Sequence, residues 1–481
     1  MRVLLVRPPV PSHTIGLKHI MLCEPLELEY VAAGLAGHEV EILDLQVERG
    51  LERRLRRFRP DVVGTGSYIT GVNEVKKLCR AAKRWNPRVH TVVGGVHASV
   101  APEDFADAAV DCIALGEGAT LMPELLGTFE RGEPLEGVAG LALPANGGLR
   151  RTAPRPYMDD PDRLPMPRRD LVAHLGHRYY YLFHRPVALL KTTWGCWYSC
   201  NFCFTWRITG GKVYARSPES IVDELAAIDA EDVYIVDDIF LIHRDRLARL
   251  AALLRARGIR KKFLCFARAD FVARNEDVIA EWAGLGLSAV LIGLEAPTQD
   301  ELDAMAKRTT VNHNRRAVEV LRRHGVDPYA SLIPGPDYGP EDWDRLRRYI
   351  EDLGLYYLNI SPLTPLPGTA IWDRHKDALT VSRRAHGLWD LSHAVVPTRM
   401  PLKAYYRELF RTYAGATLDP RRASRLSLRT RPPLLSRAYL RVWWGAIRVG
   451  IQLLGAHRHH AARAIAKAED AGPALAAGSP P

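Results

Sequence analysis

The sequence contains no long apolar run. No stretch of about 18 apolar residues is free of charge, which argues against a conventional membrane-spanning helix. The opening residues, MRVLLVRPPVP, also lack the features of a signal peptide, because Pro8 and Pro9 interrupt the apolar run and no small-residue cleavage site follows. We therefore expect a cytoplasmic protein.

Cysteine is scarce, with seven residues in a chain of 481. Four of them are scattered, and without an export signal they do not predict a disulfide scaffold. These four are Cys23, Cys79, Cys112 and Cys265. The other three, Cys196, Cys200 and Cys203, lie together in TTWGCWYSCNFCF with a C-x3-C-x2-C spacing. Their concentration in one segment indicates a single site.

The charge balance is basic, with a net charge of +11. Much of the excess lies in the arginine-rich segment 421–448, so the charge of the whole chain does not predict a nucleic-acid partner. Hydrophobic residues at 47% and charged residues at 25% are typical of a soluble globular protein. The length predicts two or three domains.

Residues 1–130 alternate short apolar runs with helical patterns. The expected strands are RVLLVRP, HEVEILDL, DVVGTGSYI, TVVGGVHAS and DCIALGEG. This β-α-β order predicts a Rossmann-like, doubly wound α/β domain. Glycines at the strand ends fall where such folds place a ligand crevice, although tight strand-to-helix turns alone would also explain them.

Four further regions follow the N-terminal domain. They are a proline-rich linker (131–185), a second β-α array (186–375), a helical region (376–465) and a disordered tail (466–481). The expected strands of the second array are ALLKTTW, DVYIVDD, KFLCFARA, AVLIGLE, YASLIPG and YYLNISPLTP. Six such units predict a partial (β/α)6 barrel with its chemistry at the carboxyl ends of the strands.

Three thiolates on one loop are able to reach one inorganic centre. A structural zinc site needs four protein ligands, and His184 or Cys265 would have to complete it. An iron–sulfur cluster normally uses four cysteines, so three leave one iron open for another ligand. Three buried cysteines without any metal are the remaining alternative.

The second array resembles the radical S-adenosylmethionine (SAM) superfamily. Its CxxxCxxC follows the first barrel strand, and VDDIF, IGLEA, SLIPG and TPLPGT are similar to the motifs of later strands, with Ala296 where a serine is usual. The resemblance implies that Cys196, Cys200 and Cys203 hold a 4Fe–4S cluster whose open iron is chelated by SAM. The residues that it assigns to SAM binding are Phe202, Asp237, Asp238, Glu295, Ile333 and Gly335.

The N-terminal domain resembles the cobalamin-binding domain of one branch of that superfamily. The matching stretches are RVLLVRPP, PDVVGTGSYIT, VVGGVHAS and LGEGA. The residues assigned to cobalamin are Gly66, Ser67, Tyr68, Ile69, Gly94, Gly95, His97, Gly116 and Glu117. The DxHxxG motif is absent, because Gln46 stands at the histidine position, so a histidine lower ligand is not expected and Tyr68 and Ile69 are candidates for the lower face. A cofactor-free module is the alternative.

Together these resemblances imply a class B radical SAM methyltransferase. One SAM would supply the methyl group by way of cobalamin, and a second would supply the deoxyadenosyl radical that removes a hydrogen atom from an unactivated carbon. An external electron donor of the flavodoxin or ferredoxin type is implied. A non-methylating cyclase or oxidoreductase with the same cofactors is the alternative reaction.

The C-terminal stretch LLSRAYLRVWWGAIRVGIQLLGAHRHH is amphipathic. Its apolar face comprises Leu440, Trp443, Trp444, Ile447, Ile451 and Leu454 beside a stripe of Arg437, Arg441, Arg448 and Gln452. Tryptophan beside arginine suits peripheral contact at the inner face of a membrane, and a helix packed on the protein fits equally well. Residues 24–48 are similar to hopanoid C-3 methylases, which makes a lipid, a polyprenoid or another small molecule the expected substrate.

Overall fold

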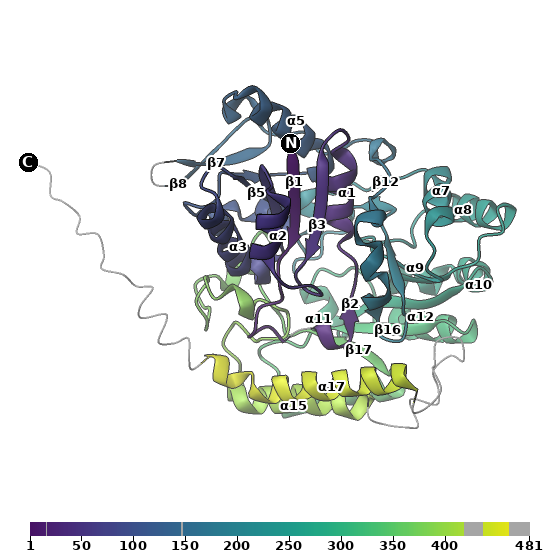
Figure 1. Cartoon of the computed structure of the whole chain (residues 1–481). Helices are drawn as coiled ribbons and strands as arrows, with labels where there is room; N and C mark the ends of the chain where they lie inside the picture. The colour runs from purple at the N-terminus through teal and green to yellow at the C-terminus, as the bar shows by residue number, and fades with distance from the viewer. Residues whose placement is uncertain (16, 146–147, 418–435, 461–481) are drawn as a thin grey trace, which may run out of the picture.

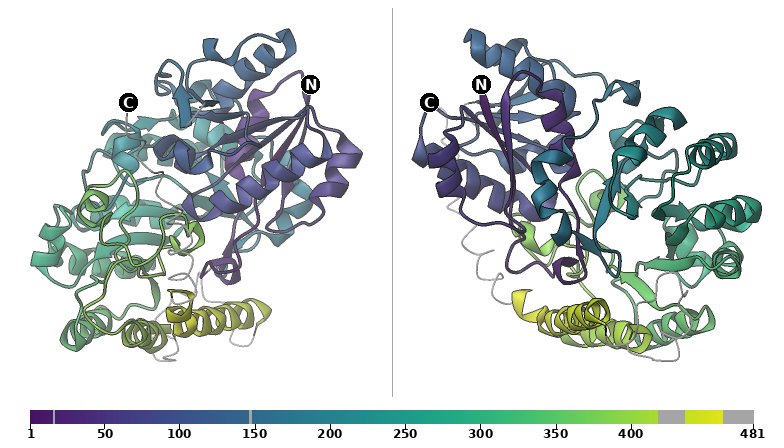
Figure 2. Two further views of the ribbon diagram at one scale, coloured as in Figure 1. Left: turned by 90° about the vertical axis from the view of Figure 1, so that its left-hand side faces the viewer. Right: turned by 45° about the vertical axis from the view of Figure 1, so that its right-hand side comes forward.

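The computed structural model describes residues 1–481 except 16, 146–147, 418–435 and 461–481. An N-terminal α/β domain stands beside a parallel partial barrel, and two C-terminal helices run along one side of the molecule (Figures 1 and 2). This arrangement confirms the predicted order of a doubly wound domain followed by a partial barrel.

The N-terminal sheet has the strand order β3-β1-β4-β5-β6-β7-β8. Its strands are β1 (Arg2–Arg7), β3 (Glu39–Asp44), β4 (Val62–Gly66), β5 (His90–Gly94), β6 (Cys112–Ala114), β7 (Leu141–Ala145) and β8 (Gly148–Arg151). Strands β1, β3, β4, β5 and β6 are parallel. Strand β1 lies between β3 and β4, so the strand order reverses at β1. The crevice of such a sheet lies at this switch point, outside the carboxyl ends of the strands.

Helices cover both faces of this sheet because its strands are apolar on both sides. One face carries α1 (Leu26–Gly34) and α5 (Gly118–Arg131), and the other carries α2 (Leu51–Phe58) and α3 (Val72–Trp85). The short α4 (Val96–Val100) follows β5. The glycines that end β4 and β5 are in close backbone contact. A Cβ on Gly66 would come within 2.6 Å of the Gly94 carbonyl oxygen, so a side chain does not fit there.

The segment 131–185 is not the simple linker that its prolines predict. Strands β7 and β8 form an antiparallel hairpin that extends the first sheet. The segment 152–186, which we call the strap, connects this hairpin to the barrel. It contains the 3-10 helices Pro161–Arg163 and Arg169–Arg178 and then β9 (Tyr180–Tyr181), which pairs with β2 (Met21–Leu22). The hairpin escaped prediction because β8, GLRR, carries none of the apolar alternation of a half-buried strand.

The barrel contains six parallel strands that pair in chain order, as predicted. They are β10 (Val187–Leu190), β13 (Asp232–Ile235), β14 (Lys262–Arg268), β15 (Leu287–Glu295), β16 (Asp327–Leu332) and β17 (Tyr357–Ile360). The helices of this array are α6 (Thr205–Ile208), α7 (Pro218–Ala227), α8 (Arg244–Ala256), α9 (Ala269–Arg274), α10 (Glu276–Gly284), α11 (Gln299–Ala304), α12 (Val311–Arg323), α13 (Pro340–Asp352) and α14 (Ala370–His375). Strands β11 (Thr193–Trp194) and β12 (Tyr214–Ala215) pair beside them.

Aromatic rings pack between the barrel strands and the strap that precedes β10. Tyr181 lies with its ring centroid 4.9 Å from that of Tyr234 and 6.2 Å from that of Tyr329. Tyr329 in turn lies 4.4 Å from Tyr357. This packing occupies the amino-terminal half of the barrel and leaves chemistry to the carboxyl ends of its strands.

The described part of the C-terminal region contains two long helices. Residues 376–401 are mostly irregular, and α15 (Leu402–Thr417) and α17 (Arg437–Gly455) pack along each other. The predicted tail 466–481 lies outside the described residues. Over the part of the chain that the structure describes, no helix has the length and apolarity needed to cross a bilayer.

Candidate active site

The three clustered cysteines follow β10 and the short strand β11. The loop turns at Gly195, whose φ of +91° and close approach to Lys212 and Thr209 leave no room for a side chain. Cys200 is buried, and Cys196 and Cys203 are half-buried. The loop thus presents its thiols at the mouth of the barrel, where Cys200 meets the end of β14 through Arg268.

The thiols influence one another's ionisation. Burial, and then the neighbouring Cys203 and Cys200, raise the pKa of Cys196 to about 11. Burial also raises the pKa of Cys203 against a hydrogen bond from Thr205. Binding a metal centre as thiolates therefore requires loss of protons at neutral pH.

The arrangement fits a cluster better than a single ion. Within the described residues, no three His, Cys, Asp or Glu side chains surround a position for one metal ion. A 4Fe–4S cluster accepts each thiolate on a different iron, so its ligands stand further apart than those of zinc. The four remaining cysteines are buried elsewhere, so the described chain leaves the fourth iron to a ligand from outside the protein.

A buried guanidinium stands beside the cysteine loop. Arg268 Nη1 donates to Cys200 Sγ at 3.9 Å, and the guanidinium lies 3.5 Å from the ring centroid of Tyr198. Its Nε donates to Asp270 at 2.9 Å, and its Nη2 donates to the carbonyl oxygen of Lys307 at 2.7 Å. With three anchors and 6% exposure, Arg268 holds a fixed positive charge at the thiols. No sequence motif marked this residue.

The predicted SAM residues at the ends of β15 and β16 lie together. Glu295 adopts a φ of +61°, and its carboxylate accepts from Lys307 Nζ at 2.6 Å. The same ammonium lies 5.8 Å from the ring centroid of Phe202, and the carbonyl of Glu295 accepts from the backbone of Ile333 at 2.7 Å. The peptide of Gly335 lies next, where a side chain would strike Asp337. Glu295 is thus already paired with a cation.

The two predicted aspartates after β13 have different surroundings. Asp237 is 1% exposed and accepts from the backbone amides of Thr192 at 2.6 Å and Thr193 at 3.0 Å, so it fixes the segment that leads to the cysteines. Asp238 is exposed and accepts from the amide of Gly195 at 2.8 Å. Asp238 therefore lies nearer to open space than Asp237.

Tyr68 faces the barrel from the loop after β4. Its side chain is 68% exposed, yet its pKa is raised, first by burial and then by Glu27 and the barrel residue Asp238. Tyr68 is thus open to solvent and close enough to Asp238 for the two side chains to interact between the domains. We call the space between these two residues the recess.

Other predicted cobalamin residues are spread over this loop cluster. Ile69 packs away from the recess, against Leu388 and Trp389. His97 is buried, and its Nε2 lies 2.8 Å from Asp104 Oδ2, so it serves the packing of α4. Ser67 is half-buried, and within the described structure its hydroxyl has no hydrogen-bond partner. At Gly116, φ is +117° and a Cβ would meet nothing within 4 Å, which leaves space for a ligand.

Residues that the sequence did not indicate complete the recess. Tyr157 from the strap packs against Tyr214 with tilted rings whose centroids are 4.9 Å apart. Burial raises the pKa of Tyr157, and Glu117 and Asp238 raise it further. Burial also raises the pKa of Glu117, with Lys191 acting against it. Both domains and the strap therefore contribute polar groups to one space.

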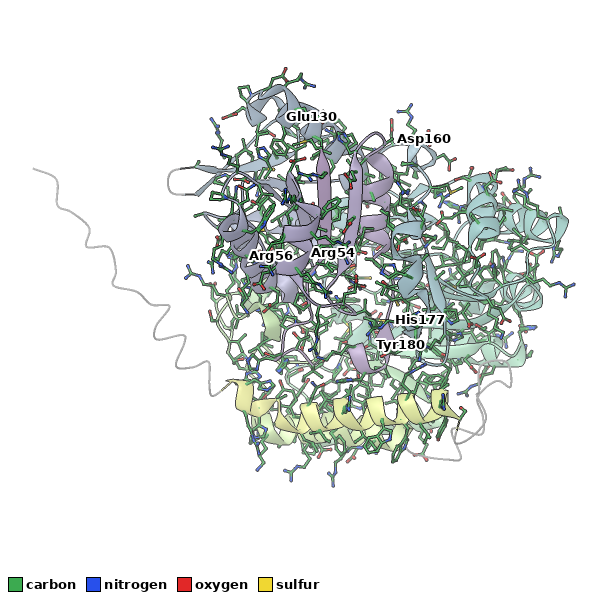
Figure 3. The ribbon with its side chains drawn as sticks, viewed as in Figure 1. Arg54, Arg56, Glu130, Asp160, His177 and Tyr180 are labelled. Carbon is green, nitrogen blue, oxygen red and sulfur yellow. The ribbon has the colours of Figure 1, made fainter. Side chains whose placement is uncertain are left out.

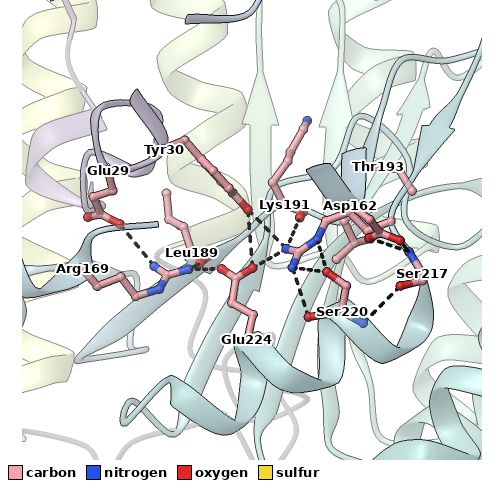
Figure 4. Close-up of polar contacts among 12 residues, drawn as sticks. Glu29, Tyr30, Asp162, Arg169, Leu189, Lys191, Thr193, Ser217, Ser220 and Glu224 are labelled. Carbon is pink, nitrogen blue, oxygen red and sulfur yellow. Dashed lines mark hydrogen bonds and ion pairs between the residues drawn. The ribbon is translucent and has the colours of Figure 1, made fainter. Parts of the chain in front are cut away.

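A buried ion network joins the N-terminal domain, the strap and helix α7 of the barrel (Figure 4). Arg169 of the strap donates to Glu24 at 2.5 Å and to Glu224 at 2.5 Å, and it lies 3.4 Å from Glu29. Arg216 also pairs with Glu224. Burial and the neighbouring Glu24 hold the pKa of Glu29 well above its usual range. The network fixes the domains on either side of the recess.

Comparison with known proteins agrees with this geometry. The B12 binding domain matches residues 3–126, and the Radical SAM superfamily matches residues 190–350. The hopanoid C-3 methylase of Methylococcus capsulatus is 33% identical over 84% of this chain and 78% of its own length. The anaerobic magnesium-protoporphyrin IX monomethyl ester cyclase of Rubrivivax gelatinosus is 25% identical over 79% of this chain and 71% of its own length.

The chain belongs to the cobalamin-dependent radical SAM methyltransferase family. Its cofactors are those of the family, namely a 4Fe–4S cluster, SAM and cobalamin.

Two solved structures of this class share the fold. The cobalamin-dependent radical enzyme OxsB aligns with a TM-score of 0.69 at 16% identity, over 86% of this chain and 66% of OxsB. The methyltransferase TsrM from Kitasatospora setae aligns with a TM-score of 0.67 at 18% identity, over 96% of this chain and 99% of TsrM. The order of the two domains and their fold are therefore shared with these proteins.

Proposed function

We propose that this enzyme methylates an unactivated carbon of a lipid or polyprenoid. The observation that carries the proposal is the proximity of two residues from different domains. Tyr68 of the B12 binding domain is exposed and lies close enough to Asp238, at the mouth of the barrel, for that carboxylate to raise its pKa. A substrate between these residues would lie between the two cofactors. The likeness to hopanoid C-3 methylase supports a polyprenoid acceptor.

The residues of the recess take distinct parts in this proposal. Cys196, Cys200 and Cys203 hold the cluster, which supplies the electron that cleaves SAM. Asp237 orients the cysteine loop, as its bonds to Thr192 and Thr193 show. The SAM contacts that we propose are Phe202, Asp238, Glu295, Ile333 and Gly335. The cobalamin contacts that we propose are Gly66, Ser67, Tyr68, Gly94, Gly95, Gly116 and Glu117.

Ring formation without methylation is the second candidate. It is favoured by the likeness to the cyclase of Rubrivivax gelatinosus, which is weaker than the likeness to the hopanoid methylase. The two reactions differ in product mass, because only methylation adds a carbon. Incubation of the anaerobically reconstituted enzyme with SAM carrying a deuterated methyl group separates them. A labelled methyl group in the lipid product supports methylation, and an unlabelled cyclised product contradicts it.

An external donor of the flavodoxin or ferredoxin type is proposed to supply the electrons. The described part of the chain offers the thiol set of one cluster only, and SAM cleavage consumes one electron in each event. We propose a cytoplasmic location with peripheral contact at the inner face of the membrane. The structural basis of that contact is the outer face of α17.

Helix α17 has one packed face and one exposed apolar face. Gly445, Gly450 and Leu453 are buried, and Gly450 lies against Phe410 of α15. The exposed apolar residues on the opposite face are Leu440 (38%), Trp443 (41%), Trp444 (57%), Ile451 (65%) and Leu454 (42%). Their spacing places them on one stripe of the helix. Helix α17 thus packs on the protein with one face and leaves its apolar face exposed.

Basic side chains are exposed on α17 and on the neighbouring α15. Arg437 and Arg448 are exposed on α17, and Lys403, Arg407 and Arg411 are exposed on α15. The single carboxylate of the two helices, Glu408, is 9% exposed and paired with Arg347 and Arg411. By contrast, Arg441 turns inward, where it donates to the carbonyl of Leu182 at 2.8 Å. Exposed apolar side chains together with exposed cations suit the surface of an anionic bilayer.

Vesicle flotation tests the membrane contact. The full-length enzyme should float with vesicles of phosphatidylcholine and phosphatidylglycerol and remain in solution with phosphatidylcholine alone. The W443A/W444A variant should lose most of this binding, whereas Met166→Ala, which removes an exposed apolar side chain from the strap, should keep it. Equal flotation of both variants would refute the assignment.

A further inference from the structure

A cavity of about 710 Å³ lies at the carboxyl ends of β1 and β3. The loops that follow these strands form one wall, and the turn that contains Lys18 and His19 forms another. That turn rests on α17, because a side chain at Gly445 would overlap the carbonyl of His19. The cavity thus lies between the B12 binding domain and the inner side of the proposed membrane helix. Tyr68 and the other recess residues do not line it.

The cavity wall is positively charged. Four basic residues line it, namely Lys18, His19, Arg49 and Arg178. Among the described residues, none of Lys18, Arg49 and Arg178 has a carboxylate partner. The only acidic residue of the lining, Glu48, already accepts from Arg54 at 3.3 Å. Arg448 and Lys18 also oppose protonation of His19, whose pKa is lowered by burial and by both cations.

Six apolar side chains also line the cavity, together with Gln46 and Gly50. The six are Pro9, Val10, Leu22, Leu45, Val47 and Leu51. Burial of hydrocarbon against such a wall contributes roughly 25 cal/mol per Å². Guanidinium groups bind phosphate oxygens in paired hydrogen bonds, and Arg49 and Arg178 are the two of this cavity. The lining therefore complements an amphiphile with an anionic head and an apolar body.

We propose that this cavity binds a lipid phosphate, with Arg49, Arg178 and Lys18 at the phosphate and the apolar wall at the first carbons of the chain. Its position one helix away from the exposed stripe of α17 makes the bilayer the source of the ligand. That source rests on the proposed membrane contact, whereas the binding site itself does not. Occupancy would hold the turn of Lys18 and His19 against α17.

Isothermal titration calorimetry with a soluble short-chain lipid tests the site without a bilayer. The full-length reconstituted enzyme is titrated with dihexanoyl phosphatidic acid below its micelle concentration, with inorganic phosphate and with dihexanoylglycerol. The R49Q/R178Q variant removes the two guanidinium groups. The matched control is Arg56→Gln, which removes an exposed arginine of α2 outside the cavity (Figure 3).

The expected result is binding of the phosphatidic acid that weakens at least tenfold in R49Q/R178Q and is unchanged in Arg56→Gln. Binding of inorganic phosphate as tight as that of the lipid would assign the site to free phosphate and overturn the lipid proposal. Equal affinity for dihexanoylglycerol, equal affinity of the two variants, or no binding by the wild-type protein would also overturn it. Loss of vesicle flotation in W443A/W444A with unchanged titration would concern the membrane contact alone.

Discussion

Arg268 Nη1 lies 3.9 Å from Cys200 Sγ and donates a hydrogen bond to it. The guanidinium is 6% exposed, so its charge is poorly screened by water. Hydrogen bonds to the sulfurs and nearby charge set the potential of an iron–sulfur cluster. Arg268 is therefore a positioning and tuning residue for the cluster rather than a ligand.

Removing this charge should make the cluster harder to reduce. Arg268→Gln should lower its midpoint potential by about 60 mV, which is a tenfold change in a one-electron equilibrium. Arg268→Lys, which keeps the charge, should fall between that variant and the wild type. Electron paramagnetic resonance during a redox titration measures the shift. Identical potentials in all three proteins would mean that Arg268 has only a packing role.

Removing the guanidinium of Arg169 should loosen the join between the domains. Arg169→Ala leaves Glu24 and Glu224 buried without this partner, and breaking a buried pair in this way costs about 3–5 kcal/mol. The neighbouring Arg168 pairs with Asp170 in an exposed position, so Arg168→Ala should cost under about 1 kcal/mol. Urea unfolding followed by tryptophan fluorescence compares the two. Similar midpoints for both variants would contradict a structural role for the network.

The segment that follows α17 should loosen as the pH falls. His460 is buried against Tyr406, and burial together with His393 and His459 lowers its pKa to about 4. The unfolded segment takes up a proton near pH 6.5 and the folded one does not, so the folded state loses stability between about pH 6.5 and pH 4 and is unaffected above that window.

Hydrogen–deuterium exchange of residues 453–460, corrected for intrinsic rates, measures this effect. Protection should be constant above pH 7 and fall toward pH 5, by no more than about 3 kcal/mol over the window. His460→Gln should flatten the profile, whereas the less buried His457→Gln should retain it. A wild-type profile that does not change between pH 7 and pH 5 would exclude this linkage.

The exposed phenol of Tyr68 should matter for cobalamin retention. Tyr68→Ala removes the largest exposed side chain of the loop after β4, while Ile69→Val changes a neighbour that packs away from the recess. We expect at least a tenfold weaker retention of cobalamin for Tyr68→Ala and little change for Ile69→Val. Absorbance of cobalamin after gel filtration gives the occupancy. Equal occupancy in the two variants would place the cofactor elsewhere.

The parallel strands of both domains were predictable because each is a short, local apolar run bounded by turn residues. The grouping of the three cysteines was predictable for the same reason, since they lie within one segment. Arg268 was not, because it becomes adjacent to Cys200 only when β14 pairs into the barrel. Tyr157 was likewise hidden in a proline-rich segment that folds back to Tyr214.

Two predicted residues have surroundings that the sequence did not reveal. His97 stands in a glycine-rich turn typical of a cofactor edge. Its side chain nevertheless bonds to Asp104, which lies in the 3-10 helix Pro102–Phe105. Glu295 matches its motif, and its pairing with Lys307 depends on a loop with two non-glycine residues at positive φ, Ala306 and Arg308. Sequence identifies such motifs, whereas the partners follow from the folded chain.

The most direct measurement is SAM cleavage by the anaerobically reconstituted enzyme, with bound cobalamin quantified in the same sample and Cys200→Ser as the control. We predict about one cobalamin for each chain, cleavage of SAM to 5′-deoxyadenosine under reducing conditions, and no cleavage in the variant. A wild-type protein that cleaves SAM equally well without cobalamin and methylates no lipid would contradict the function proposed for this recess.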